Sequence, residues 1–586
     1  MLQSSPSESG LSIPLIEGSL TLIAVAASFA WPQLGDCWFA RAERALGKLA
    51  RRKRLSVAVV GLSVVLLRLA LLPLLPIPLP FVPDDFSFLL AADTFAHGRL
   101  TNPTPDMWIH FESIHIDMMP TYMSMYFPGP GLLFAGSEVL FGHPWYGLLI
   151  VNALMCAAIC WMLQAWLPPA WAFLGGMLVV LRISLFSYWI NTYTGGGALA
   201  ALGGALVLGS LPRFMRHAQF RHAMLMAAGI VLLAYTRPYE GMLLCLPVAA
   251  ALIHWLFKGK HRPITAILVR RNAAPLALLI IAAVWLGYYD YRAFGSPFTL
   301  PYTVNRATYA RVPYYIWQPL RPEPVYHHLV MRRFYDSEDY DELAVYKDYL
   351  TWTGTFKETL IKITGEEYFF VGFTLLPPLF LLRRVWSDRR IRFLIVCASM
   401  AAASIFVGIF LMPHYLAPFT AAFYAIGLQS MRHLRLWKWR GQPVGKTLVR
   451  TCVMSCIALS GLRAYAAPLH IDLAKLPSAI WVFEWYGPDH FGTGRADVER
   501  RLEQLPGGQL AIVRYSAKHH PGYDWVHNAA DISKSKVIWA REMDNASNRE
   551  LLQYYKDRHA WLIEPDTQSA TVSPYPQPEQ QTAALR

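Results

Sequence analysis

Two adjacent carboxylates, Asp84 and Asp85, directly follow an apolar run long enough to cross a lipid bilayer. Two acids side by side repel each other and gain nothing from lipid, and ionisable groups at a membrane edge are candidates for function. A carboxylate there can act as a general base that takes a proton from a hydroxyl. The alternative role is structural, with Asp84 or Asp85 capping a helix from Phe86 to Ala96. The two roles are compatible, because a cap position also fixes a carboxylate in space.

Two motifs at the ends of other apolar runs carry groups suited to a phosphate. Arg237 stands at a span end beside Tyr239, and His414 is followed by Tyr415 in a proline-bounded turn. The planar guanidinium can bind two phosphate oxygens while tyrosine hydroxyls add hydrogen bonds. We therefore predict that these four residues bind a lipid phosphate. The alternative is a snorkelling arginine among interfacial aromatic residues, with a structural histidine.

Two long polar loops hold the remaining candidate residues, which we expect to line a sugar or acceptor pocket. They are His110, Glu112, His115, Asp117 and Tyr126 in the first loop, and Tyr302 and Asn305 in the second. His110, Glu112 and His115 are also an alternative ligand set for a divalent metal, although their spacing matches no recognised metal motif. The predicted chemistry requires no cofactor, and a divalent metal stays open.

The composition indicates an integral membrane protein, because the chain of 586 residues is 54% apolar and only 16% charged. The apolar runs are continuous rather than alternating, which favours helices over a β-barrel. The net charge of +14 lies largely in short loops between these runs. It therefore indicates orientation and gives no support to a nucleic-acid partner. The seven cysteines lie in or beside apolar segments, so they support neither a disulfide framework nor a zinc site.

Hydropathy predicts about 11–12 transmembrane helices. The predicted spans are 11–31, which is uncertain as a span or a signal anchor, 55–79, 146–166, 171–187, 195–211, 223–236, 239–257, 273–290, 367–382, 393–412, 415–431 and 448–467. The basic cluster 41–54 is cytoplasmic by the positive-inside rule, and every later basic short loop then falls on the same side. Asp84, Arg237 and His414 consequently share the opposite, external face.

The chain divides into four predicted regions. Residues 1–54 hold the extra span and the basic loop, and 55–468 form a transmembrane catalytic domain with external loops 80–143 and 291–366. Within the first loop, 132–141 is too short to cross and reads as an interfacial helix. Residues 469–566 alternate strand-like runs with a helix, which predicts a small external α/β domain. The tail 567–586 is rich in Pro, Gln, Thr and Ser and is predicted to be disordered.

The motifs resemble the GT-C superfamily of membrane glycosyltransferases. The resemblance rests on the acidic pair Asp84-Asp85 with Gly98 about a dozen residues later, and on the turn Tyr126-Phe127-Pro128-Gly129 that opens an interfacial helix. It is nearest to the branch of protein O-mannosyltransferases, the lipid A aminoarabinose transferase and the RgtA-type lipopolysaccharide sugar transferases. The aminoarabinose transferases carry Lys-Pro-Pro at this turn, so the departure here shifts phosphate binding to Arg237 and His414.

The resemblance implies inverting transfer of a sugar from a polyprenyl-phosphate donor to a hydroxyl of a glycan, lipid or protein. The expected location is a bacterial inner or plasma membrane, with the site on the periplasmic face and membrane lipids as further partners. Asp84 or Asp85 would be the base, and Arg237, Tyr239, His414 and Tyr415 would stabilise the leaving phosphate. Two alternatives remain: a transporter or flippase of lipid-linked sugars, and a lipid-linked glycan ligase that depends on His110 or His414.

Overall fold

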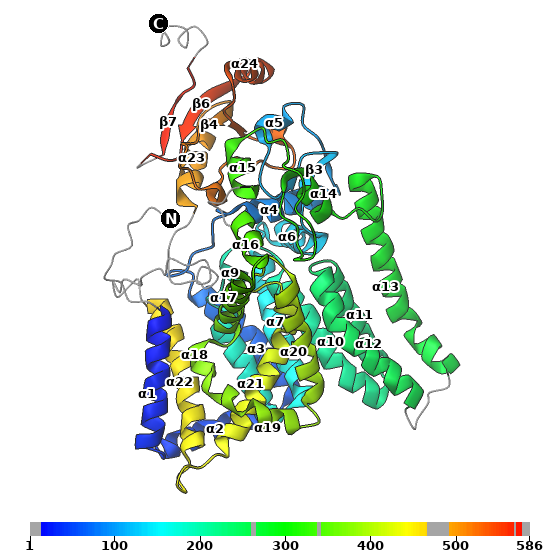
Figure 1. The fold of residues 1–586 in the computed structure, drawn as a ribbon, viewed down its shortest axis with the longest axis vertical. Coiled ribbons are helices and arrows are strands. Elements are labelled where there is room, and N and C mark those ends of the chain that lie inside the picture. Colours follow the sequence, from blue (N-terminus) through cyan, green and yellow to red (C-terminus); the bar gives the residue numbers. More distant parts are fainter. Residues whose placement is uncertain (1–12, 259–264, 337–341, 466–491, 568–569, 577–586) are drawn as a thin grey trace.

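The computed structural model describes residues 13–258, 265–336, 342–465, 492–567 and 570–576, and it is a helical bundle with a small sheet domain at one end (Figure 1). The main helices of the bundle are α1 (Ile13–Ala30), α3 (Lys53–Ala70), α7 (Trp145–Trp166), α8 (Pro169–Val179), α10 (Gly197–His217), α11 (Phe220–Ala234), α12 (Pro238–Lys258), α13 (Thr265–Phe294), α17 (Trp352–Phe370), α20 (Arg392–Val407), α21 (Thr420–Arg435) and α22 (Val444–Tyr465). The helical membrane fold is thereby confirmed.

Not every predicted span is a long straight helix. Within the described residues, six helices are long and apolar enough to cross a membrane, and a seventh candidate is the pair Trp352–Phe370 and Gly372–Ser387, bent by 79°. Other predicted spans are shorter or interrupted: 171–187 becomes α8 followed by a π-helical turn, η1 (Val180–Ser184), and 55–79 ends as a helix at Ala70, before two prolines. Residues 11 and 12 of the first predicted span lie outside the described residues.

The elements at the two ends of the bundle differ in charge and kind (Figure 1). At the end that carries the sheet domain lie α4 (Pro83–Ala96), α5 (Trp108–Phe111), α6 (Pro128–Phe141), α14 (Pro301–Tyr309), α15 (Leu329–Tyr335) and the short strands β1 (Asn102–Pro103), β2 (Ile116–Asp117) and β3 (Thr121–Ser124). Toward the opposite end lie the basic helices α2 (Asp36–Arg51) and α19 (Leu382–Ser387). Further short elements are α9 (Tyr188–Asn191), α16 (Glu342–Tyr349), α18 (Gly372–Leu375), η2 (Pro377–Leu381) and η3 (Ala417–Phe419). This separation is the one that the basic loops predicted.

A buried ion pair fastens α1 to the bundle. Glu17 of α1 is fully buried, and Arg182 donates to its Oε1 over 2.9 Å. The hydroxyl and the backbone N–H of Thr374 donate to the same oxygen at 3.0 and 3.2 Å. Removing one partner of such a pair would leave an uncompensated buried charge, so α1 belongs to the core of the fold.

The C-terminal domain is a four-stranded sheet in the order β5-β4-β6-β7. Its elements are α23 (Thr493–Glu503), β4 (Gly508–Val513), η5 (Pro521–Tyr523), η6 (Ile532–Lys534), β5 (Val537–Arg541), α24 (Asn545–Tyr554), β6 (Arg558–Glu564) and β7 (Thr571–Pro574). β4 pairs in parallel with β5 and β6, as expected for an α/β domain, while β7 pairs antiparallel with β6. The prediction of disorder from residue 567 is wrong for β7, because ladder bonds to β6 order it; 577–586 lie outside the described residues.

Candidate active site

The acidic pair lies inside the first turn of α4. The N-cap is Val82 and Pro83 is the first helical residue, so the predicted capping role of Asp84 or Asp85 is wrong. Proline suits this position because its fixed φ matches a helix and its missing N–H leaves no unpaired donor. The helix therefore begins earlier than expected and carries both carboxylates on its first turn.

Asp85 is fully buried. Its Oδ2 accepts the backbone N–H of Phe81 over 3.2 Å and its Oδ1 accepts the hydroxyl of Thr194 over 3.0 Å. Burial and the charge of Asp84 nevertheless outweigh these bonds and raise the pKa of Asp85 to about 7. Asp85 thus holds its proton below neutral pH.

Asp84 is the carboxylate that a substrate can reach, because its side chain is 31% exposed. The hydroxyl of Tyr126 donates to its Oδ1, and Nδ1 of His115 lies 3.0 Å from the same oxygen. The Tyr126 ring is held by stacking on Phe88 at 4.2 Å. Asp84, His115 and Tyr126 are therefore in direct contact.

Arg237 is the cation of the same site. Its side chain is buried, with 7% of the residue exposed, and its Cζ lies 4.4 Å from the centroid of the Tyr415 ring. Its Nε has no hydrogen-bond partner among the described residues. Because an unpaired buried donor is costly, this nitrogen is suited to bind an anion. Tyr302 lies within electrostatic range of both Arg237 and Asp84, and its ring is 5.4 Å from that of Tyr126. Tyr302 consequently joins the carboxylate and the guanidinium into one site.

His414 and Tyr239 differ in their relation to Arg237. Nδ1 of His414 lies 2.8 Å from the hydroxyl of Tyr188, and its backbone N–H donates to the same oxygen over 3.1 Å. Burial and the charge of Arg237 hold the pKa of His414 well below its usual range, so the imidazole is neutral and Arg237 supplies the positive charge. Tyr239 instead packs against Tyr315, with ring centroids 5.3 Å apart.

A close backbone contact joins the turn beside Asp84 to the turn that carries Arg237. Gly129, in the turn that follows Tyr126, donates its N–H to the carbonyl of Tyr235 over 2.9 Å. A Cβ at this position would lie 2.7 Å from that oxygen, so only glycine fits. The turn beside Asp84 is thereby fixed against the turn that carries Arg237.

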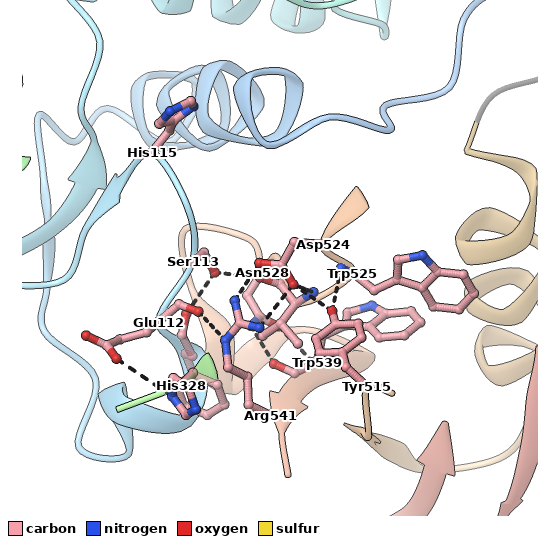
Figure 2. Close-up of polar contacts among 12 residues, drawn as sticks. Glu112, Ser113, His115, His328, Tyr515, Asp524, Trp525, Asn528, Trp539 and Arg541 are labelled. Atoms are coloured by element: carbon pink, nitrogen blue, oxygen red, sulfur yellow. Dashed lines mark hydrogen bonds and ion pairs between the residues drawn. The ribbon is translucent and has the colours of Figure 1, made fainter. Parts of the chain in front are cut away.

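His110 and the backbone carbonyl of Glu112 contact Arg541 of the C-terminal domain, and Figure 2 shows the contact of Glu112. Nδ1 of His110 is 3.0 Å from the carbonyl of Arg541. The carboxylate of Glu112 accepts the hydroxyl of Tyr309 over 3.1 Å and lies 2.9 Å from Nδ1 of His327. The predicted pocket role is therefore replaced by a contact between the loop and the domain.

The alternative metal set is not assembled either. His115 turns toward Asp84 while His110 and Glu112 turn toward other partners. Over the described part of the chain, no three His, Cys, Asp or Glu residues are close enough to hold a metal ion.

Asp117 and Asn305 form a buried pair beside the site. The amide of Asn305 donates to Oδ1 of Asp117 over 3.0 Å and its Oδ1 accepts the hydroxyl of Tyr335 over 3.2 Å. Burial raises the pKa of Asp117 to about 8, so this carboxyl is protonated at neutral pH. The pair holds β2 against α14 and lies behind the residues that a substrate would meet.

Two contacts of the site were missed from the sequence. Thr194 binds Asp85 and Tyr188 binds His414. Thr194 precedes three glycines, of which Gly196 has a φ of +103°, and such a run signals a turn packed closely against its neighbours. The partner of Tyr188 lies 226 residues away and had no local signal.

No protein-family model and no curated protein matches the chain. Among solved structures, the chain is similar to ArnT from Cupriavidus metallidurans bound to undecaprenyl phosphate, with 11% identity, coverage of 90% of this chain and 94% of that one, and a TM-score of 0.45. It is also similar to the oligosaccharyltransferase AglB from Archaeoglobus fulgidus in complex with an inhibitory peptide and a dolichol-phosphate, with 10% identity, coverage of 90% and 70%, and a TM-score of 0.45. The function proposed below rests on the side chains of this chain.

Proposed function

We propose that the protein is a membrane glycosyltransferase that moves a sugar from a polyprenyl-phosphate donor to an acceptor hydroxyl with inversion. The observation that carries this proposal is the pairing of the half-exposed Asp84 with the buried Arg237 across Tyr302. A base and a phosphate-binding cation in one site are the two groups that such a transfer needs. Their place beside apolar helices favours a donor whose phosphate is attached to lipid.

In the proposed reaction, Asp84 takes the proton of the acceptor hydroxyl while the oxygen of that hydroxyl attacks the anomeric carbon of the sugar. The bond from that carbon to the phosphate oxygen breaks, and polyprenyl phosphate leaves with the electron pair. Arg237 stabilises the negative charge of the leaving phosphate, assisted by the hydroxyl of Tyr302 and the neutral His414. Tyr126 and His115 orient the Asp84 carboxylate.

The state of Asp85 fits this division of roles. Because burial keeps Asp85 protonated below neutral pH, the repulsion between the two acids is relieved. Asp85 then positions the first turn of α4 through Phe81 and Thr194.

The partners proposed are a lipid-linked sugar donor and a glycan, lipid or protein acceptor, with surrounding membrane lipids. We place the site at the periplasmic face of a bacterial inner or plasma membrane, because the basic helix α2 lies at the opposite end of the bundle. The chemistry needs no metal ion for a good leaving group such as a lipid phosphate.

The proposal is tested with purified protein in nanodiscs and a panel of radiolabelled polyprenyl-phosphate sugars, with membrane extracts as acceptors. The expected products are labelled glycoside and free polyprenyl phosphate in equal amounts. Movement of intact donor across proteoliposomes without transfer would instead indicate a transporter. If no donor in the panel is consumed and none moves across the membrane, both activities are rejected.

A further inference from the structure

The C-terminal domain shares a hydrophobic core with the first external loop. This core contains Leu90, Phe111, Ile116, Met118 and Tyr122 on one side and Leu510, Ile512, Ile538, Leu551 and Leu562 on the other. Sharing a core with the loop makes the domain part of the rigid scaffold around α4 rather than a loosely attached module.

The connection between β4 and β5 carries the polar part of this contact. Arg541 donates its Nε to the carbonyl of Glu112 over 2.7 Å and forms an ion pair with the buried Asp524 (Figure 2). Ser113 donates its hydroxyl to the carbonyl of Val526 over 2.5 Å. The segment 524–530 is thus fixed against the loop by charged and neutral hydrogen bonds.

The same segment reaches α4 at two points. The ring of His527 stacks on Phe86, the residue that follows the acidic pair, with centroids 4.2 Å apart and planes inclined by 5°. Nine residues along the chain from Asp84, the carboxylate of Asp93 accepts the N–H of Ala530 over 2.6 Å. The helix that carries the acidic pair is therefore held at both ends by the C-terminal domain.

Arg495 is the second residue of the C-terminal domain that contacts Phe86. Its Cζ lies 4.8 Å from the Phe86 ring and 4.6 Å from the Trp539 ring, so the guanidinium fills the space between them. Its Nη2 donates to the carbonyl of His527 over 3.0 Å. Phe86 thus contacts two residues of the C-terminal domain, one through its ring face and one through a cation–π contact.

His527 makes this contact through its ring alone. It is 3% exposed, and neither ring nitrogen has a hydrogen-bond partner among the described residues. Leaving two polar atoms unpaired in a buried site costs stability, so stacking on Phe86 rather than hydrogen bonding is the interaction that this side chain provides.

We propose that the C-terminal domain is a positioning part of the active site, in which His527 and Arg495 hold Phe86 and thereby fix the first turn of α4 with its two carboxylates. The expected effect on the transfer rate rests on the proposed function, whereas the expected effect on the rigidity of α4 rests on the geometry alone. His527 acts through Phe86 and is a positioning residue. A small misplacement of the base is enough to slow transfer strongly.

The test compares His527→Ala, which removes the stacked ring, with His527→Phe, which keeps the ring and removes the unpaired nitrogens. His559→Ala is the matched control, because His559 lies in the same domain but is exposed. Each protein is assayed for kcat and KM per folded molecule in nanodiscs, and by hydrogen exchange of the peptide that covers α4. We expect His527→Ala to lower kcat on the order of 10- to 100-fold with KM nearly unchanged, and to speed exchange in α4.

His527→Phe and His559→Ala should behave as wild type in both measurements. A double variant of His527→Ala with Phe86→Ala should lose no more than Phe86→Ala alone, because both changes break one contact. The inference is overturned if His527→Ala matches wild type, or if His527→Phe is as impaired as His527→Ala. If wild type transfers no sugar, the proposed function fails while exchange in α4 still decides whether the domain holds the helix.

Discussion

Replacing the buried Asp85 by asparagine should stabilise the protein at alkaline pH and destabilise it slightly at acidic pH, where only the lost hydrogen bond counts. The pKa of about 7 in the folded protein compares with an ordinary value of 3.8. Below about pH 4 the carboxyl is protonated in both states. As the pH rises from 4 to 7 the unfolded chain loses this proton while the folded chain keeps it, so the free energy of unfolding falls.

The magnitude follows from about 1.4 kcal/mol per pH unit, which over this interval amounts to roughly 4 kcal/mol. Asparagine carries no charge to desolvate, but it has a single acceptor oxygen for the two donors from Phe81 and Thr194. Each lost bond to a buried donor costs about 1–2 kcal/mol. We therefore expect Asp85→Asn to gain about 2 kcal/mol at pH 8.

The assay is thermal unfolding in detergent from pH 5 to pH 8.5, followed by intrinsic tryptophan fluorescence. The melting temperature of wild type should fall across this range more steeply than that of Asp85→Asn. Asp557→Asn, which changes an exposed carboxylate of the C-terminal domain, is the control and should follow wild type. Equal slopes for wild type and Asp85→Asn would refute the assignment of a raised pKa to Asp85.

Three other outcomes are expected. Arg237→Lys should lower kcat about 100-fold, because an ammonium cannot reproduce the planar, two-pronged hydrogen bonding of the guanidinium. Tyr239→Phe, outside the Arg237 contact, should change kcat less than about threefold. Both are measured as donor-dependent transfer rates. Tyr126→Phe should lower kcat about 10-fold by removing one hydrogen bond to Asp84 while circular dichroism stays unchanged. Asp117→Asn should keep wild-type stability near pH 4 and exceed it at pH 9 in thermal unfolding, because from about pH 4 the unfolded chain loses this proton while the folded chain, with a pKa of about 8, keeps it. These expectations fail if Arg237→Lys or Tyr126→Phe turns over at the wild-type rate, or if Asp117→Asn is no more stable than wild type at pH 9.

The grouping of the candidate residues at one end of the bundle was predictable from the sequence, because charge patterning is a strong signal. Loop lysines and arginines gave the orientation, and the orientation alone brought Asp84, Arg237 and His414 to one end of the bundle. The strands of the C-terminal domain were also predictable, since parallel strands read as short apolar runs.

The contacts within the site were less predictable. The roles of His110 and Glu112 depend on a domain more than 400 residues later in the chain, as the distance between His110 and Arg541 shows. Helix boundaries near proline were also misjudged: Pro83 begins α4 rather than preceding it, which moved both acids from the cap into the first turn. The stacking of His527 on Phe86 had no sequence signal, because any aromatic pair could make it.

The most direct test of the account is the rate of a single turnover by Asp84→Asn, with binding of the polyprenyl-phosphate donor measured in the same nanodiscs. If Asp84 is the base and Arg237 binds the phosphate, as proposed, transfer should slow by about 10²- to 10⁴-fold while the donor Kd stays unchanged. Asp84→Glu should retain measurable transfer. If Asp84→Asn transfers sugar at the wild-type rate with an unchanged Kd, Asp84 is not the base and the proposed mechanism is wrong.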